Sequence, residues 1–367
     1  MLKRIYHKSL SILDAVLWKM HAGLERRGFI KPINSSMVKH IENGIAVDHP
    51  YPVNFIDEDM KLFAHYTGYK SGTETVFEFE NINVSYDAIL FKGMNNTYQS
   101  VPHIVFRADY GLLYILKNYL FKKRVKGNDE INYVLIYDFW SAGNYYHWLV
   151  DTLPRLLIFL EELKQKNYSL LLPADCRAFM KRTLSYYNIH HITFINENEF
   201  LNVKHLMVPY YLVGSGHIHP PKVLEIRQFF LNKIPGISNF TKLYVSRGRQ
   251  KARKIVNEDS VIDVVRQFGF DIIYFEDYTF EQQVEIGRGA KYMVSSHGAN
   301  LTNMMFMEEH TRVLELIRQD APNFCYWALA SAVKVDYYYQ LCAVQGNDHL
   351  WVDIELFKLN LYRLLNE

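Results

Sequence analysis

The sequence predicts an α/β protein with two Rossmann-like domains that face a cleft, preceded by an amphipathic helix. Two observations support this prediction. Short apolar runs alternate with segments of helical periodicity in two successive blocks, which is typical of βαβ units around a parallel sheet. The 367 residues, 49% of them hydrophobic, are also enough for two domains with a sizeable core. The predicted segments are a helix over 1–31, domains over 32–234 and 240–345, and a C-terminal helix over 346–367 that can pack back on the N-terminal domain.

The first 31 residues have the pattern of one amphipathic helix. Apolar residues recur at helical spacing from Leu2 to Leu24, and the other face carries seven basic residues against two acidic ones. A basic amphipathic helix can lie on an anionic membrane surface, or it can pack on its own domain or on a partner subunit. Both alternatives stay open, and the oligomeric state is not predicted.

The N-terminal block predicts alternating strands and helices. Thr75–Asp87 alternates as a hairpin or a strand pair does, and 145–164 has helical periodicity with a kink expected at Pro154. The other predicted strands are 133–137, 169–172, 191–195 and 203–208, and the other predicted helices are 178–187 and 223–234.

The C-terminal block repeats the alternation after a predicted linker at 235–241. Asn257 is expected to cap a helix over 258–268, and Thr279 opens the next helix in a capping box with Gln282. The predicted strands are 243–246, 271–275, 292–295, 312–317 and 335–341, with further helices from Asn300 and from Pro322.

Composition and charge exclude several classes of protein. A formal net charge of +2 gives no global field for nucleic acid. The three cysteines are far apart, make neither a disulfide framework nor a CxxC metal site, and are expected to be buried free thiols in a reducing compartment. No run of ~20 apolar residues and no signal-peptide pattern is present, so we expect no spanning helix and no secretion.

The stretch 291–303 indicates a ligand site. The apolar run Tyr292–Val294 is followed by the small-residue turn Ser295–Ala299 and by a helical pattern from Asn300. At Gly298 a phosphate can approach the backbone closely, and N–H groups at the start of the new helix point at it. An ordinary strand-to-helix turn without a ligand has the same pattern.

Several cations follow the predicted strand 243–246. Arg247, Arg249 and Arg253 come just after the strand end, beside Ser246. Ligands bind at this edge of an open parallel sheet, and a guanidinium grips phosphate oxygens with a planar fork. Taken alone this is a solvated basic loop, but together with the Gly298 turn it predicts one anion site.

Glu315 is a carboxylate inside the otherwise apolar run 313–317. A buried carboxylate is costly unless it accepts hydrogen bonds. The ribose diol of a nucleotide would supply donors, as in dinucleotide sites. Protein backbone or an arginine would satisfy the same carboxylate, and both interpretations stay open.

His147 and Asp151 are the candidate proton acceptors. Their spacing of i and i+4 puts both side chains on one helix face, where a carboxylate orients an imidazole and increases its basicity. Such a pair can take a proton from an attacking hydroxyl, with either residue as the base. No third metal ligand is evident nearby. We interpret the acidic run 57–59 and the pair His217–His219 as loops and not as metal sites.

The ordered set of motifs resembles glycosyltransferase family 61. The pattern of that family is matched at His147-Trp148-x-x-Asp151 with Pro154-Arg155, at Ser246-Arg247, Arg253 and Asn257-Glu258, at Phe280-x-Gln282/Gln283-Val284, at His297-Gly298-Ala299-Asn300-Leu301-Thr302-Asn303, and at Glu315. Each motif is weak alone, but their order from Tyr137 to Ile317 is specific.

The resemblance implies a GT-B fold, inversion at the anomeric carbon and no essential metal. The co-substrate is expected to be a nucleotide sugar, with a UDP-sugar favoured. No further cofactor is expected. The base, Asp151 or His147, is expected on the acceptor side. The expected donor-binding residues are Ser246, Arg247, Arg253, His297, Gly298, Ala299, Asn300, Leu301, Thr302 and Glu315, with Arg155, Arg249, Asn257, Glu276, Gln283 and Asn303 as secondary candidates.

The implied function is transfer of a hexosyl or pentosyl group to a glycan or a lipid-linked oligosaccharide, in the assembly of a surface polysaccharide such as a capsule. Because no secretion signal is found, we expect a bacterial enzyme in the cytoplasm, with peripheral membrane contact through residues 1–31 as an option. The alternative is a nucleotide- or polysaccharide-binding module that has lost activity. A nucleotide-sugar epimerase or dehydrogenase should carry a GxGxxG turn after its first strand, which the sequence lacks.

Overall fold

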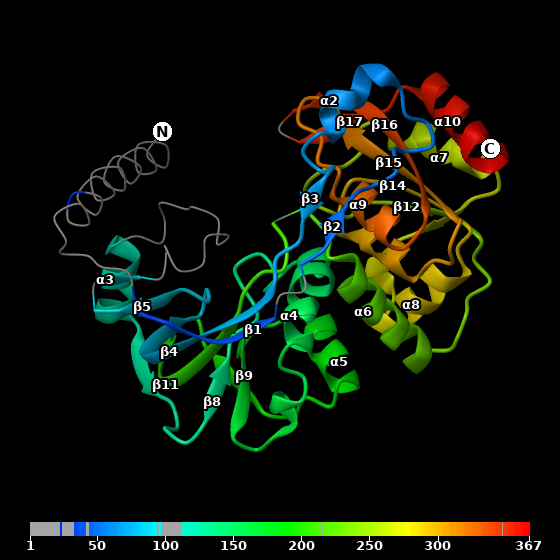
Figure 1. Ribbon diagram of the computed structural model, residues 1–367. Coiled ribbons are helices and arrows are strands. Elements are labelled where there is room, and N and C mark those ends of the chain that lie inside the picture. Colours follow the sequence, from blue (N-terminus) through cyan, green and yellow to red (C-terminus); the bar gives the residue numbers. More distant parts are fainter. Residues whose placement is uncertain are drawn as a thin grey trace. The chain divides into compact units, whose positions relative to one another are not determined.

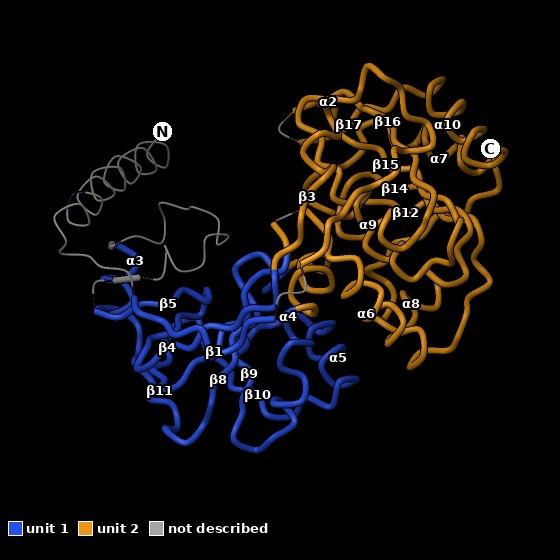
Figure 2. The backbone as a smooth tube through the Cα atoms, in the orientation of Figure 1, with its two compact units in different colours: residues 1–43, 73–143, 155–212 blue, residues 44–72, 144–154, 213–367 orange. Residues whose placement is uncertain are grey.

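The computed structural model describes residues 23, 33–41, 44–93, 95–96, 112–214, 216–346 and 348–367. The chain forms two compact units (Figure 2). Unit 1 comprises 1–43, 73–143 and 155–212, and unit 2 comprises 44–72, 144–154 and 213–367. Apart from position 23, the predicted basic helix over 1–31 lies outside the described residues. The units are described one at a time below.

Unit 1 is organised around one mixed β-sheet with the strand order β10-β9-β8-β11-β4-β5-β6, in which β1 also pairs with β4 and β7 with β11 (Figure 1). Strands β8 to β11 pair in parallel, whereas β4 runs antiparallel to β11. The strands are β1 (Ser36–Ile41), β4 (Glu74–Ser85), β5 (Leu90–Lys92), β6 (Asn95–Asn96), β7 (Lys123–Lys126), β8 (Asn132–Val134), β9 (Tyr168–Pro173), β10 (Ile192–Ile195) and β11 (Glu199–Pro209), and the helices are α3 (Leu112–Phe121), η4 (Glu162–Lys164) and α5 (Ala178–Tyr186). The predicted parallel βαβ pattern therefore accounts for the later strands of this sheet and not for β4 to β6.

Strand β4 occupies most of the segment 75–87, which was predicted to form a hairpin or a strand pair. It is one continuous strand that pairs with β11 on one side and with β1 on the other. Val76, Phe79 and Ile82 are at most 1% exposed, so its apolar residues reach the core without a reversal of the chain. The segment holds no glycine or proline that would favour a tight turn, which explains why it stays extended.

Unit 2 contains a sheet with the order β13-β12-β14-β15-β16-β17, parallel from β13 to β16 and antiparallel at β17. The bounds are β12 (Lys242–Val245), β13 (Asp271–Ile273), β14 (Tyr292–Ser296), β15 (Arg312–Arg318), β16 (Asp336–Gln345) and β17 (His349–Trp351). The first parallel strand in the chain, β12, lies between the second and the third, which is the order of flavodoxin-like doubly wound sheets. The strand order reverses between β12 and β14, and ligands of such sheets bind at this switch point.

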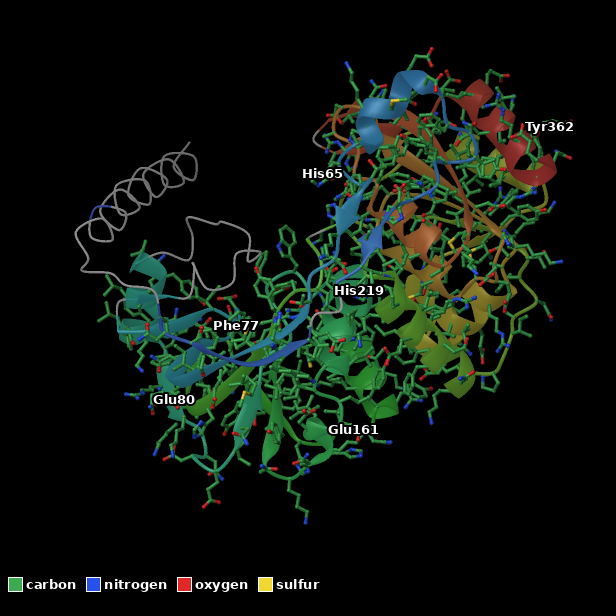
Figure 3. All side chains as sticks on the ribbon, viewed as in Figure 1. His65, Phe77, Glu80, Glu161, His219 and Tyr362 are labelled. Carbon is green, nitrogen blue, oxygen red and sulfur yellow. The ribbon has the colours of Figure 1, made fainter. Side chains whose placement is uncertain are left out.

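Helices flank the sheet of unit 2 and complete its core. Residues of α7 such as Val261 and residues of α10 such as Phe357 share one buried cluster with Val294 and Leu314 of the strands. Helix α10 therefore packs within unit 2, with Tyr362 exposed on its outer side (Figure 3). The helices are η1 (Asp57–Asp59), α2 (Met60–Phe63), η3 (His147–Thr152), α6 (Pro220–Lys233), α7 (Glu258–Gln267), η5 (Phe275–Asp277), α8 (Phe280–Gly289), η6 (Ala299–Phe306), α9 (Cys325–Ala332) and α10 (Ile354–Asn366). The residues of α4 (Leu153–Leu157) are divided between the two units. Strands β2 (Ala46–Val47) and β3 (Tyr69–Lys70) form a small antiparallel pair.

Two segments from the first half of the chain belong to unit 2. In 44–72, the carbonyl of Pro50 accepts a hydrogen bond from Trp327 Nε1 at 2.8 Å. In 144–154, the Tyr145 hydroxyl donates to Asn303 Oδ1 at 2.9 Å. These non-local contacts explain why the observed division differs from a single boundary near residue 234. The predicted linker 235–241 lies inside unit 2, where the Ser238 N–H donates to the carbonyl of Glu285.

The capping predictions have opposite outcomes. Thr279 and Gln282 form the predicted capping box at the start of α8. Asn257 precedes α7 but makes no capping hydrogen bond. Its amide instead exchanges two hydrogen bonds with the backbone of Val352, because β17 runs past this position. No helix among the described residues is both long and apolar enough to cross a membrane.

Candidate active site

The carboxyl ends of β12 and β14 meet at the switch point of the unit 2 sheet. The two strands pair in parallel, with Val245 opposite Ser295. Residues 246–249 continue from β12 and residues 297–303 continue from β14. Both segments that were predicted to bind phosphate therefore leave the sheet at the same edge, although about 50 residues of chain separate them.

Arg247 lies directly against Gly298. A Cβ atom at Gly298 would lie 1.9 Å from Nη1 of Arg247 and 2.5 Å from its Cζ. The backbone at Gly298 is extended, with φ at 163°, so the position requires glycine for space and not for an unusual conformation. Any side chain at position 298 would displace the guanidinium.

Arg247 is a buried cation without an ionic partner among the described residues. It is 9% exposed, and its Nε atom has no hydrogen-bond partner. Burial, together with repulsion from Arg253, lowers the pKa of Arg247 below the ordinary value for arginine. An uncompensated buried charge is costly, so this position would be stabilised by an anion.

Ser246 and Glu258 support the turn that carries Arg247. The Ser246 hydroxyl donates to Glu258 Oε1 at 2.7 Å and accepts from the Gly248 N–H at 3.0 Å. The Tyr244 hydroxyl donates to the same Glu258 oxygen at 2.9 Å. Ser246 is 0% exposed, so its hydroxyl shapes the turn and does not reach a ligand in this conformation.

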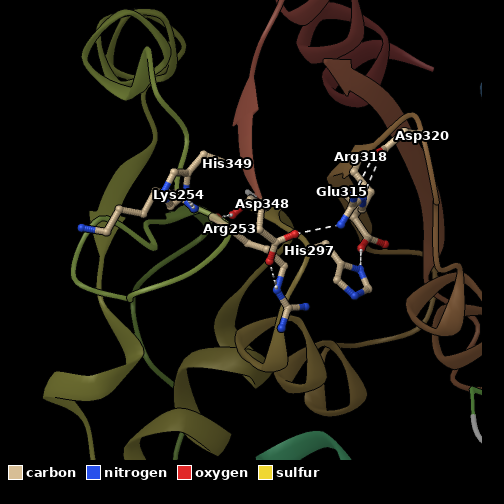
Figure 4. A network of polar contacts seen from close by, with 9 residues as sticks. Arg253, Lys254, His297, Glu315, Arg318, Asp320, Asp348 and His349 are labelled. Carbon is tan, nitrogen blue, oxygen red and sulfur yellow. Dashed lines mark hydrogen bonds and ion pairs between the residues drawn. The ribbon is translucent and has the colours of Figure 1, made fainter. Parts of the chain in front are cut away.

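Arg253 lies in a polar network at the same edge of the sheet (Figure 4). Its Nε is 3.8 Å from Asp348 Oδ2, and Arg318 Nη1 donates to Asp348 Oδ1 at 2.9 Å. A pocket of about 270 Å³ opens here, lined in part by Arg253, His297, Arg318 and Asp348. The sequence interpretation missed Asp348, because it follows Gly346 in a hairpin with no motif of its own.

Glu315 is hydrogen-bonded entirely by the protein. His297 Nδ1 donates to Glu315 Oε1 at 2.5 Å, and the Tyr337 hydroxyl donates to Oε2 at 2.5 Å. Burial, together with the charge of Glu315, raises the pKa of Tyr337 well above its usual value, so the hydroxyl remains a donor. Because Glu315 is 0% exposed, it cannot contact a ribose in this conformation. Of the two interpretations of this carboxylate, the one in which the protein itself satisfies it is therefore correct in this conformation. Glu315 acts on the site by orienting His297.

His147 and Asp151 lie in helix η3, which has π-helical geometry. The helix predicted over 145–164 is continuous only to Leu157: η3 passes directly into α4, where Pro154 has no N–H to donate, and a turn at 158–161 precedes η4. His147 Nδ1 donates to Asp151 Oδ2 at 2.6 Å. A carboxylate can only accept, so Nδ1 carries the proton and Nε2 holds the lone pair of the neutral ring.

Three neutral side chains lie between His147 and His297. The Tyr326 ring is 5.1 Å from the ring of His297 and 5.3 Å from that of Tyr146, which precedes His147. Burial raises the pKa of both tyrosines and of Cys325 well above their ordinary values. Cys325, like Cys176 and Cys342, is a buried free thiol, as predicted. All three side chains are buried, and none of them adds a charge.

Helix η6 is held in place by amide hydrogen bonds. Asn303 donates from Nδ2 to Gln283 Oε1 at 3.1 Å, and Gln283 Nε2 donates to the carbonyl of Phe275 at 3.0 Å. Leu301 and Thr302 are also buried, whereas Ala299 and Asn300 at the start of the helix are partly exposed. The Leu301 N–H donates to the carbonyl of Gly298 at 2.9 Å, so the N–H groups of Ala299 and Asn300 before it have no acceptor within the helix.

Three of the secondary candidates are held by other partners in the protein. Arg249 is on the surface, where Nη1 pairs with Asp277 Oδ1 at 2.6 Å and the guanidinium stacks on Tyr274. Glu276 is exposed and accepts a hydrogen bond from Gln250. Arg155 belongs to unit 1, where it is 2% exposed and donates from Nε to the carbonyl of Pro209.

The histidine and acidic motifs set aside earlier do not join the site. Asp59 accepts a hydrogen bond from the Tyr339 hydroxyl, and His219 caps α6. Among the described residues, Glu78, Glu80 and His205 have ligand atoms close enough to share a metal ion, but they lie in unit 1 and Glu80 is exposed.

Comparison with known proteins finds a family match over a segment that includes parts of both units. Residues 145–314 match the family model described as Glycosyltransferase 61. This segment of the chain is similar to glycosyltransferase family 61. The matched segment begins beside His147 and ends within β15, so it includes both predicted phosphate-binding segments, while Glu315 and Asp348 follow it.

A curated relative supports the same assignment. The chain is 31% identical over 97 residues to "EGF domain-specific O-linked N-acetylglucosamine transferase" of Drosophila melanogaster. The match covers 26% of this chain and 18% of that relative. The chain therefore matches less than a fifth of the relative's length.

Proposed function

We propose that this protein is an inverting, metal-independent glycosyltransferase that moves a sugar from a nucleoside diphosphate, with UDP favoured, to a hydroxyl group of a glycan or glycoconjugate. The observation that carries the proposal is the buried Arg247 at the switch point, which has an unbonded Nε and no ion pair among the described residues, against a glycine that no side chain can replace without displacing it. A diphosphate supplies the missing negative charge. The GT-B fold, the bacterial origin and a role in surface polysaccharide remain predictions.

In this proposal the donor diphosphate lies at the carboxyl ends of β12 and β14. Arg247 and Arg253 neutralise it, and N–H groups at the start of η6 donate to its oxygens. As the bond to the sugar breaks, negative charge grows on the leaving diphosphate. Groups that already point at that charge stabilise the transition state more than they stabilise the bound donor. This difference is the condition for catalysis.

The acceptor hydroxyl loses its proton to the pair in η3. Because Nδ1 of His147 donates to Asp151, the lone pair of the neutral ring is on Nε2, which favours His147 as the base with Asp151 orienting it. The acceptor oxygen then attacks the anomeric carbon from the face opposite the diphosphate. A single displacement of this kind inverts the configuration at that carbon.

A ligand screen followed by a turnover assay tests the proposal. Nucleoside diphosphates that bind the folded protein should raise its melting temperature, with a stabilisation of about 2.7 kcal/mol at a concentration 100 times Kd. UDP-N-acetylglucosamine is the first donor to test, because the Drosophila relative is named for that sugar. Release of UDP is then measured over a panel of glycan acceptors, with and without EDTA.

The outcomes separate the proposed enzyme from its alternatives. Binding with turnover that persists in EDTA supports a metal-independent transferase, whereas turnover that requires a divalent cation contradicts that part of the proposal. Binding without turnover across donors and acceptors favours the inactive binding module. If no nucleoside diphosphate shifts the melting temperature, the anion site has been misassigned.

A further inference from the structure

The pocket beside Arg253 contains one carboxylate that can still accept hydrogen bonds from a ligand. Glu315 is buried and bonded by His297 and Tyr337, as described above. Asp348 lines the pocket itself, with its side chain 33% exposed. Asp348, about 30 positions later in the chain, can therefore take the ribose-binding role that was predicted for Glu315.

The two oxygens of Asp348 are in different situations (Figure 4). Oδ1 accepts a hydrogen bond from Arg318 Nη1 at 2.9 Å. Oδ2 lies 3.8 Å from Arg253 Nε, which is an ion pair but is longer than a hydrogen bond. Arg318 is itself held by two hydrogen bonds to Asp320. The carboxylate is thus oriented by cations on both sides and retains acceptor capacity on Oδ2.

The position of the pocket indicates which part of the donor enters it. Arg253 and His297, on the side of the proposed diphosphate, line the pocket, but neither His147 nor Asp151 does. The transferred sugar has to lie beside the base in η3, so the opposite end of the donor extends from the diphosphate into the pocket. That end is the nucleoside, whose ribose presents two adjacent hydroxyl groups.

We propose that Asp348 binds the ribose hydroxyls of the nucleotide donor and so selects ribonucleotides over deoxyribonucleotides. The carboxylate accepts from the 2′- and 3′-hydroxyls, while Arg253 contacts the adjoining phosphate. Hydrogen bonds to a charged acceptor are the stronger kind, and a site built for a hydroxyl discriminates against a ligand that lacks it. This inference rests on the proposed function, because it assumes that a nucleotide occupies the site.

Calorimetry with UDP, 2′-deoxy-UDP and 3′-deoxy-UDP tests the inference without requiring a variant. The wild-type protein should bind at least one deoxy form roughly 10- to 100-fold more weakly than UDP, as for a lost hydrogen bond to a charged group. In Asp348→Asn that difference should shrink to about threefold or less, because the amide is no longer charged. Asp320→Asn is the matched control: it also alters the surroundings of Arg318 but does not line the pocket, and it should discriminate as the wild type does.

Each result either supports or overturns the role of Asp348. Equal affinity of the wild type for all three ligands overturns it and leaves the proposed function intact, as does undiminished discrimination in Asp348→Asn. If Asp348→Asn weakens binding of UDP-N-acetylglucosamine but not of UDP, the carboxylate contacts the transferred sugar, and the ribose assignment is wrong. If UDP, GDP, ADP and CDP all fail to bind the wild type, both the proposed function and this inference fall.

Discussion

Replacing Arg247 with methionine is expected to have opposite effects on ligand binding and on the stability of the protein without ligand. Arg247 is 9% exposed and its Nε lacks a partner, so the unliganded protein carries the cost of a buried, uncompensated charge. Methionine keeps an unbranched apolar stem of similar length and removes that charge. The free energy of unfolding without ligand should therefore stay constant or rise by about 1 kcal/mol.

The affinity of Arg247→Met for a nucleoside diphosphate should fall. Removing one partner of a buried charge pair costs on the order of 2–4 kcal/mol, or roughly 30- to 1000-fold in Kd. Calorimetry with UDP measures the affinity, and urea unfolding without ligand measures the stability. Arg249→Met is the matched control, because Arg249 is paired with Asp277 on the surface, and it should change the affinity little. Unchanged UDP affinity in Arg247→Met would refute the diphosphate role. A clear loss of stability without ligand would show that Arg247 has a partner in the protein.

Three further predictions concern the neighbouring residues and the pH dependence of stability. Gly298→Ala should weaken UDP binding about tenfold, because its Cβ would occupy space within 1.9 Å of Arg247 Nη1, and it should have little further effect in the Arg247→Met background. Asp151→Asn and His147→Ala should each lower kcat by at least about 100-fold while leaving Kd for UDP nearly unchanged, as measured by initial rates and calorimetry. Burial lowers the pKa of His49 from 6.5 to about 4. Its neutral ring therefore contributes roughly 2–3 kcal/mol of stability above pH 6.5 that is lost as the pH falls toward 4, as measured by urea unfolding at several pH values.

Matched variants make these three predictions specific. Gly143→Ala adds a Cβ with nothing within 4 Å and should leave UDP affinity unchanged. If both variants of the η3 pair turned over normally, the base assignment would be wrong. His49→Gln should remove much of the pH dependence of stability between pH 4 and 6.5, whereas His310→Gln, on an exposed side chain, should not. Identical pH profiles for wild type and His49→Gln would contradict the assignment to this buried ring.

Local sequence patterns were sufficient for the features that depend on near neighbours. The spacing of His147 and Asp151 predicted a contact that the structure gives as 2.6 Å, and the capping box at Thr279 is present in α8. Both depend on residues three or four positions apart, where helical geometry alone brings side chains together. The β–α alternation of the C-terminal block likewise follows from periodicity within short windows.

The exceptions each involve a partner that is distant in the sequence. Asn257 has the composition of an N-cap, but its hydrogen bonds go to Val352, 95 residues away. Glu315 has the pattern of a ribose ligand, but Tyr337 from the neighbouring strand and His297 occupy both of its oxygens. Nothing adjacent to these residues in the sequence identifies the competing partner.

The sequence by itself determined which residue types are present to bind an anion and to accept a proton, because the apolar runs and the turns after them are local. Only the tertiary structure decided that Arg247 and Gly298 touch, since that contact requires β12 to lie beside β14 in the sheet. It also decided that the carboxylate available in the pocket is Asp348 and not Glu315. The physical reason is that strand order and burial arise from packing summed over the whole of unit 2, whereas a motif reports only the few residues around it.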